Sequence, residues 1–178
     1  MKLFLRLFTF TYLFILAITV HAQGVWEMQL NNPYQNSFQK AYDLYPNIPK
    51  GILEAVAYSN THFQHINPTD EAASCLGLPA YHGVMGLVQD PSLFFRDNLA
   101  LVVHLSDYNK NEIIQEPHKN ILAYAQAFQQ IKNDLNLQSM AIEDHIPILD
   151  ALSEIPNDGG LKNNYAFDSQ IYSILRHL

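Results

Sequence analysis

YPNIPKGILEAVAYSNTHFQ, at residues 45–64, is the stretch of the sequence that decides the fold. Ile52 and Val56 recur within it at the spacing of one helix face, and a proline opens the apolar run, where a helix has no backbone hydrogen bond to lose. These signals predict a helix over 49–62. A polar loop separates it from a second compact run, GVMGLVQ at residues 83–89.

Together the two runs resemble the lysozyme-like domain of lytic transglycosylases, whose members read I-P-x-x-L-L-A-x-A-x-x-E-S-x-F and then G-x-x-G-L-M-Q. The positions that match are Ile48, Pro49, Ala55, Ala57, Phe63, Gly83, Gly86, Leu87 and Gln89, with Val88 in place of the methionine. A weaker match, Ala123 and Tyr124, stands where the family has A-A-Y-N-A-G. The resemblance implies a lysozyme-like helical domain with a loop-lined cleft.

The family's catalytic glutamate falls on Asn60, and the serine after it falls on Thr61. In the family this glutamate protonates the glycosidic oxygen, whereas an asparagine amide has no proton of that acidity to transfer. Asn60 can therefore hydrogen-bond a sugar without cutting its bond. The alternative is that Asn60 only caps a helix end, a position that asparagine favours. The resemblance implies a peptidoglycan glycan-strand binding module that has lost catalysis.

The expected substrate-binding residues share a place in or beside the two runs, or in the weaker match. They are Asn60, Thr61, Gln89, Tyr124, Tyr58 and Tyr81. A tyrosine ring can stack on a sugar face while its hydroxyl bonds a sugar oxygen, and the alternative for each is an ordinary place in the core with one polar end.

Two acids in the polar loop, Asp70 and Glu71, are the weak candidates for a relocated catalytic acid. They leave open a second hypothesis, an active lytic transglycosylase with muramidase-like chemistry, although a solvated loop acid is the default. A third hypothesis is a helical partner-binding module without glycan function. An open cleft lined by Asn60, Gln89 and Tyr124 would disfavour that third hypothesis.

Three histidines, His62, His65 and His82, lie close to the same runs and raise the question of a metal site. No acidic or cysteine ligand accompanies them at a matching spacing, and the sequence has no HExxH pattern. We therefore expect no metal and no other cofactor.

The first 22 residues have the features of a secretory signal peptide. Lys2 and Arg6 precede an apolar core, and Val20 and Ala22 are the small residues that signal peptidase requires. An uncleaved anchor is the alternative, but the apolar core is short for a membrane span. We expect cleavage near Ala22, a secreted or periplasmic protein and no stable membrane anchor.

Composition bounds the class of partner. The chain has 178 residues and a formal net charge of −7, and the length suffices for one domain with its own core. An acidic protein repels the phosphates of nucleic acid, so we expect no nucleic-acid partner. The charge does not oppose a glycan.

Apolar residues at helical spacing predict further helices. Their expected starts, in chain order, are near Phe38, Asp90, Asn109, Pro117, Asp144 and Phe167. Phe94 and Phe95 are expected on the apolar face of the helix that Asp90 caps. No stretch shows sustained apolar alternation between hairpin turns, so the predicted class is all-α.

The expected organisation is a signal peptide at 1–22, a lysozyme-like helical domain at 23–156, and a linker with an extra C-terminal helix at 157–178. The apolar stripe of that last helix, which includes Ile171 and Ile174, predicts that it docks on the domain. The chain also resembles the region that precedes the catalytic domain in some bacterial N-acetylmuramoyl-L-alanine amidases. This second resemblance implies a cell-wall amidase as a partner.

Overall fold

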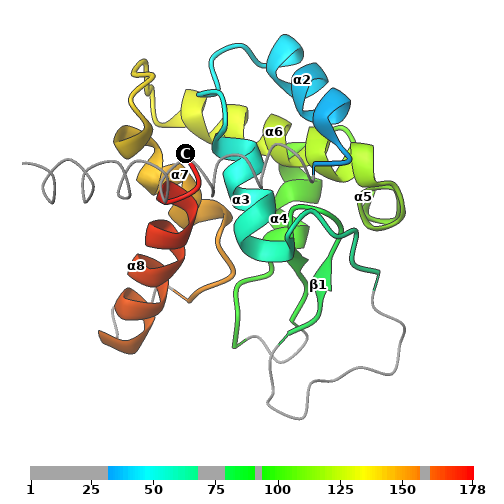
Figure 1. Cartoon of the computed structure of the whole chain (residues 1–178). Coiled ribbons are helices and arrows are strands. Elements are labelled where there is room, and N and C mark those ends of the chain that lie inside the picture. Colours follow the sequence, from blue (N-terminus) through cyan, green and yellow to red (C-terminus); the bar gives the residue numbers. More distant parts are fainter. Residues whose placement is uncertain (1–31, 68–78, 91–93, 157–160) are drawn as a thin grey trace, which may run out of the picture.

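The computed structural model describes residues 32–67, 79–90, 94–156 and 161–178. The helices in these ranges are α2 (Gln35–Leu44), α3 (Ile52–Thr61), α4 (Asn98–Leu105), α5 (Lys110–Gln115), α6 (Pro117–Asp134), the 3-10 turn η1 (Ile142–His145), α7 (Ile146–Leu152) and α8 (Leu161–Leu175). A short antiparallel hairpin joins β1 (Tyr81–His82) to β2 (Leu87–Val88). The described part of the protein is thus mostly helical, as the sequence predicts, and the hairpin is a short β element within it (Figure 1).

The core is built around α6, which begins at Pro117 as expected. Helices α2, α4, α5 and α7 all pack against it. The largest fully buried side chains come from every part of the domain, and among them are Phe38, Ile52, Leu87, Leu99, Ile113, Ile121, Phe128 and Ile148. Apolar positions at helical spacing are buried along α2 and most of α6, whereas Leu135, expected on the same face, follows the end of α6 and is 49% exposed.

Helix α3 begins at Ile52, three residues later than the expected start at Pro49. Gly51 precedes it with φ +93°, a left-handed conformation that cannot continue a right-handed helix. The Tyr42 hydroxyl oxygen accepts hydrogen bonds from Gly51 N at 2.9 Å and Leu53 N at 3.3 Å, and its proton goes to the Glu54 carboxylate. A side chain from α2 therefore fixes the start of α3, which the proline signal could not show.

The GVMG segment is the turn of the hairpin, in which Tyr81 of β1 pairs with Val88 of β2. Met85 N donates to Asn120 Oδ1 at 2.8 Å, and Asn120 Nδ2 donates to Ile113 O at 3.1 Å. A Cβ on Gly83 would come within 2.0 Å of the Asn120 amide nitrogen, and Gly83 has φ +72°. Only glycine lets the turn lie this close to α6, so the glycine spacing marks a hairpin turn.

The helix expected after Asp90 starts later than predicted, so that expectation was wrong. Asp90 Oδ2 does accept from the backbone N–H groups of Phe94 and Phe95, at 2.9 and 2.8 Å. However, α4 itself begins at Asn98, with Asp97 as the N-cap whose carboxylate accepts from the third helical N–H. Phe94 is 66% exposed and does not belong to a buried helix face.

Of two further expected helix starts, one is found where the sequence predicts it and one is not. Asn109 and Glu112 form the capping box of α5, at the expected start. Asp144, expected as a cap, instead lies inside η1, and α7 begins at Ile146 with Pro147 in its first turn. A capping residue can therefore mark a short 3-10 turn as readily as the longer helix that follows it.

Helix α8 packs against α3 and α7, and Figure 1 shows it in red beside α3 in cyan. Ile171 and Ile174 are 7% and 3% exposed and belong to the same core as α6, which confirms the expected docking. Among the described residues no helix has the length and apolar character needed to cross a bilayer. The expected signal peptide at 1–22 and the acids Asp70 and Glu71 lie outside the described residues.

Candidate functional site

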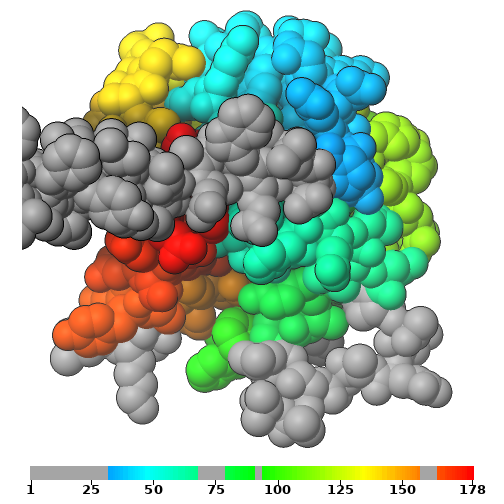
Figure 2. Space-filling model, viewed as in Figure 1, coloured from blue at the N-terminus to red at the C-terminus, as the bar shows by residue number. Residues whose placement is uncertain are grey.

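An open cleft of about 340 Å³ lies between α3, β1, the segment after α7, and α8. Its lining residues are Ser59, Asn60, Tyr81, Glu154, Ile155, Ala166, Ser169, Gln170 and Ser173. Figure 2 shows α8 in red and orange beside the green segment that carries the hairpin, with the surface hollowed between them. Most of the lining side chains carry hydroxyl, amide or carboxylate groups, so the cleft is polar.

Asn60 lies in the last turn of α3, and its side chain is fixed by the hairpin. Asn60 Nδ2 donates to Met85 O at 3.1 Å. Because a carbonyl only accepts, the amide NH₂ must face Met85, and Asn60 Oδ1 is left without a donor among the described residues. A Cβ on Gly86 would lie 2.8 Å from Asn60 Cβ, so glycine at 86 makes room for this side chain. Asn60 is thus held in the cleft wall with a free acceptor.

Thr61 faces the interior and does not line the cleft. Its hydroxyl oxygen lies 2.8 Å from Ala57 O and 2.6 Å from Val84 O, and the residue is 5% exposed. The hydroxyl has one proton to donate, and both acceptors within reach are backbone carbonyls, one in α3 and one in the hairpin turn. The Thr61 hydroxyl therefore links α3 to that turn. This placement favours a structural role for Thr61.

Glu154 is the carboxylate of the cleft, and the sequence analysis did not single it out. Its side chain accepts from Tyr81 OH at 3.1 Å and from Gln170 Nε2 at 3.1 Å. Its backbone oxygen accepts from Arg96 N at 2.8 Å, and the residue is only 7% exposed. The one sequence signal for it is an acid placed between the apolar residues Leu152 and Ile155, where burial is expected.

Burial, together with the negative charge of Glu154, raises the pKa of two tyrosine hydroxyls well above the ordinary value. One is Tyr81, which donates to Glu154 from the cleft wall. The other is Tyr124, which is 3% exposed and lies in the core. Both phenols therefore stay neutral, and only Tyr81 belongs to the cleft lining.

Tyr58, another of the expected binding residues, lies outside the cleft. Tyr58 packs its ring against those of His62, Phe63 and His177, with centroids 4.8, 5.4 and 4.7 Å away. Neither Tyr58 nor any of these three partners lines the cleft.

Gln89 lies in a separate pocket of about 180 Å³ beside α4. Its Oε1 accepts from Lys110 Nζ at 2.5 Å. An open cleft lined jointly by Asn60, Gln89 and Tyr124 therefore does not form. Of the six expected binding residues, the structure brings Asn60 and Tyr81 together in one cleft.

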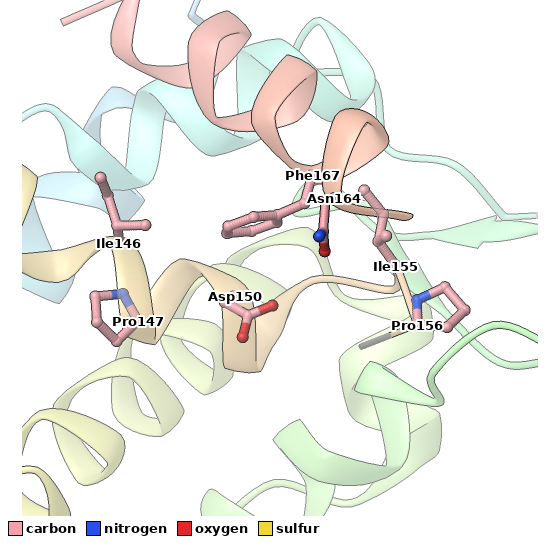
Figure 3. A pocket seen from close by; sticks show the side chains of 7 residues that line it. All are labelled: Ile146, Pro147, Asp150, Ile155, Pro156, Asn164 and Phe167. Carbon is pink, nitrogen blue, oxygen red and sulfur yellow. The ribbon is translucent and has the colours of Figure 1, made fainter. Parts of the chain in front are cut away.

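A third cavity, of about 310 Å³, lies between α7 and α8 and shares Ile155 with the cleft. Figure 3 shows the Phe167 ring reaching across it from α8 toward Ile146 on α7. Its acid, Asp150, pairs with Arg96 through a 3.0 Å contact. None of the residues expected to bind substrate lines this cavity.

The histidines give no metal site within the described ranges, where no group of three His, Cys, Asp or Glu side chains is placed to hold an ion. Burial is the main cause that lowers the pKa of His65 and His82, which favours their neutral forms.

Comparison of the chain with family models, with curated proteins and with solved structures found no match. The chemistry of the cleft follows from its own residues. The cleft presents hydrogen-bond acceptors from Asn60 and Glu154 and hydroxyl groups from α3 and α8. None of the described residues that line it is basic.

Proposed function

We propose that the protein binds glycan strands of peptidoglycan in this cleft and does not cleave them. The observation that carries the proposal is Asn60, which lines the cleft at the position where the resembling family has its catalytic glutamate. Sugars present many hydroxyls, and each one that is buried on binding needs a partner. Amides, serine hydroxyls and a carboxylate supply such partners along the cleft.

Two residues of the cleft support the proposal that it does not cleave the strand. Asn60 cannot transfer a proton to a glycosidic oxygen. Glu154 accepts hydrogen bonds from Tyr81 and Gln170, which is the arrangement that holds a carboxylate as an acceptor. The proposed role of the cleft is therefore binding.

A second candidate function is an active lytic transglycosylase with a relocated acid. Glu154 favours this candidate because it places a carboxyl group in the same cleft as Asn60. Asp70 and Glu71 were the earlier candidates for that acid, and the second function would make one of the three essential for glycan release.

The proposed setting is the cell envelope, after export and cleavage near Ala22, with a cell-wall amidase as a partner. The net charge of −7 supports a role away from nucleic acid. The charge is compatible with a polymer that carries neutral sugars.

The deciding experiment measures binding to insoluble peptidoglycan and release of soluble muropeptides in parallel, for the wild type, Asn60→Ala and Asn111→Ala. Asn111 is an exposed residue of α5 away from the cleft, so its variant is the matched control. We expect binding without release by the wild type and the control. Loss of one neutral hydrogen bond in Asn60→Ala should cost about 0.5–1.5 kcal/mol of binding free energy. Vigorous release that stops in Glu154→Gln would establish the second function, and no binding by any variant would exclude both.

A further inference from the structure

We propose that the cleft recognises a primary ammonium group of the cell-wall polymer, with the Glu154 carboxylate as its counter-charge. The proposal rests on the proposed function for the identity of the polymer, and it names the chemical group that the cleft selects.

The first observation is the burial of Glu154 without a cationic partner. Glutamate is rarely as buried as this residue, at 7% exposed, unless it is paired with a positive charge. In the described part of the chain, every ion pair within 4.0 Å uses a different acid, Asp150, Glu112 or Glu116. The charge of Glu154 is thus left without a counter-charge from those residues.

The second observation is that the partners of Glu154 are neutral and leave it with unused capacity. A carboxylate offers about four acceptor positions. Tyr81 and Gln170 are the two side chains that donate to it among the described residues. At least one position remains for a donor that enters from the cleft.

The third observation concerns the rest of the cleft wall. Asn60 directs one N–H of its amide to Met85 O, so its oxygen is the acceptor left for a ligand. Ser59 donates to Ser173 at 2.8 Å. None of the described residues that line the cleft is basic. An anionic group would meet only repulsion from Glu154, whereas an ammonium group has three donors and no acceptor. The cleft and an ammonium group are therefore complementary.

A metal ion is the other cation that a buried carboxylate could hold. Within the described ranges no second and third ligand of the kinds His, Cys, Asp or Glu accompany Glu154. An organic ammonium needs no such set, because hydrogen bonds to one carboxylate, an amide oxygen and hydroxyls satisfy it.

Two parts of a cell-wall polymer can supply this chemistry. One is the free amine of an amino sugar that has lost its N-acetyl group, and the other is the side-chain amine of a diamino acid in the stem peptide. Both carry a primary amine that becomes an ammonium group when protonated, so the experiment separates them.

The main test compares binding of the unaltered protein to native peptidoglycan and to peptidoglycan whose primary amines have been capped with acetic anhydride. We expect capping to weaken binding about tenfold or more, as for loss of a charge-assisted hydrogen bond. Equal binding to the two polymers would overturn this inference and leave the proposed function standing. No binding to either polymer would overturn the proposed function itself.

The matched variants are Glu154→Gln and Glu143→Gln. Glu143 is an exposed residue of η1, and its variant removes the same charge away from the cleft. We expect Glu154→Gln to bind native peptidoglycan as weakly as the wild type binds the capped polymer, and to show no further loss on capping. A capping effect that persists in folded Glu154→Gln, with an unchanged melting temperature, would assign the ammonium site to another residue.

The two sources are separated with soluble probes. These are a partly deacetylated chitin oligosaccharide against its fully acetylated form, and an N-terminally acetylated, lysine-containing tripeptide against the same peptide with its Nε also acetylated. Preference for one free-amine probe, lost in Glu154→Gln, identifies the source of the ammonium group. No preference within either pair would overturn the inference.

Discussion

Lys132 and His145 meet inside the domain, with Lys132 Nζ 3.0 Å from His145 Nε2. Lys132 is 3% exposed, and its Nζ also donates to Asn47 O at 2.6 Å and Ser139 O at 2.8 Å. An ammonium group has only protons to offer, so His145 Nε2 must be the acceptor. The proton of the ring is then on Nδ1, which lies 2.7 Å from Ala141 O. The pair joins α6 and η1 to the chain that leads into α3, and it requires a neutral histidine.

This relationship predicts that stability falls as the pH falls. Burial, as the largest cause, lowers the pKa of His145, and the charge of Lys132 acts in the same direction. In the unfolded chain the histidine takes up a proton near its ordinary pKa of about 6.5, whereas in the folded chain it stays neutral to lower pH. As the pH drops through that value, protonation stabilises the unfolded state, and the free energy of unfolding falls. We expect the melting temperature to be steady above about pH 7.5 and to decline toward about pH 5.5.

His65, His82 and His177 also have a lowered pKa, so they add to the slope with the same sign. The contribution of His145 to the pH dependence of the melting temperature is the difference in slope between the wild type and His145→Gln. His118→Gln, at an exposed position of α6, is the control. A slope in His145→Gln identical to that of the wild type would show that the Lys132–His145 pair does not cause the pH dependence of stability.

Replacement of the buried lysine should be costly although its partners are not acids. Lys132→Met keeps the apolar stem but removes the donor of the part-buried hydrogen bonds to the Asn47 and Ser139 carbonyl oxygens. Each lost hydrogen bond should cost about 0.5–1.5 kcal/mol in the free energy of unfolding, measured by urea titration. Lys40→Met, at an exposed position of α2, is the control and should change stability by less than about 0.5 kcal/mol. Equal midpoints for the two variants would contradict the role given to Lys132.

Gly86 links the hairpin turn to the candidate site, and its replacement should affect both stability and binding. Gly86→Ala introduces a side chain at φ +67° and a Cβ 2.8 Å from Asn60 Cβ. The strain should cost about 1–3 kcal/mol of stability, and displacement of Asn60 should weaken binding to peptidoglycan.

Gly51→Ala is the matched control for this effect. Gly51 also has a positive φ, +93°, but its added Cβ would meet Leu178 at 3.3 Å and not the cleft. We expect Gly51→Ala to lower the melting temperature while the folded protein binds as the wild type does. Equal binding by both glycine variants would show that the position of Asn60 is unimportant.

The helices could be predicted where one face carries a regular apolar stripe. The stripes that place Phe38 in α2, Phe128 in α6 and Ile174 in α8 are all buried as expected. Helix starts were less predictable, because contacts from distant parts of the chain decide them. Tyr42 fixes the start of α3 from another helix, and no local pattern marks that contact.

The candidate site could be predicted only in part for a related reason. A motif fixes the order of residues along the chain, but the fold decides which way each side chain points. Asn60 and Tyr81 reach the cleft from α3 and β1, whereas Gln89, just after β2, turns to Lys110. Glu154 and Gln170 come from segments that carry no motif, and only the packing of α8 brings them to the cleft.

The last prediction concerns α8, which both contributes to the core and forms one wall of the cleft. Ile174→Ala removes a side chain that is 3% exposed, and such a change should cost about 2–5 kcal/mol in the free energy of unfolding. Tyr172→Ala, at a position 69% exposed on the same helix, is the control and should leave stability nearly unchanged. Because Gln170 and Ser173 reach the cleft only while α8 is docked, Ile174→Ala should also lose binding at temperatures where α6 stays folded. Hydrogen exchange checks this directly: the amides of α8 should lose protection before those of α6. If α8 and α6 lose protection together, the helix is part of one cooperative unit, and the loss of binding must follow global unfolding.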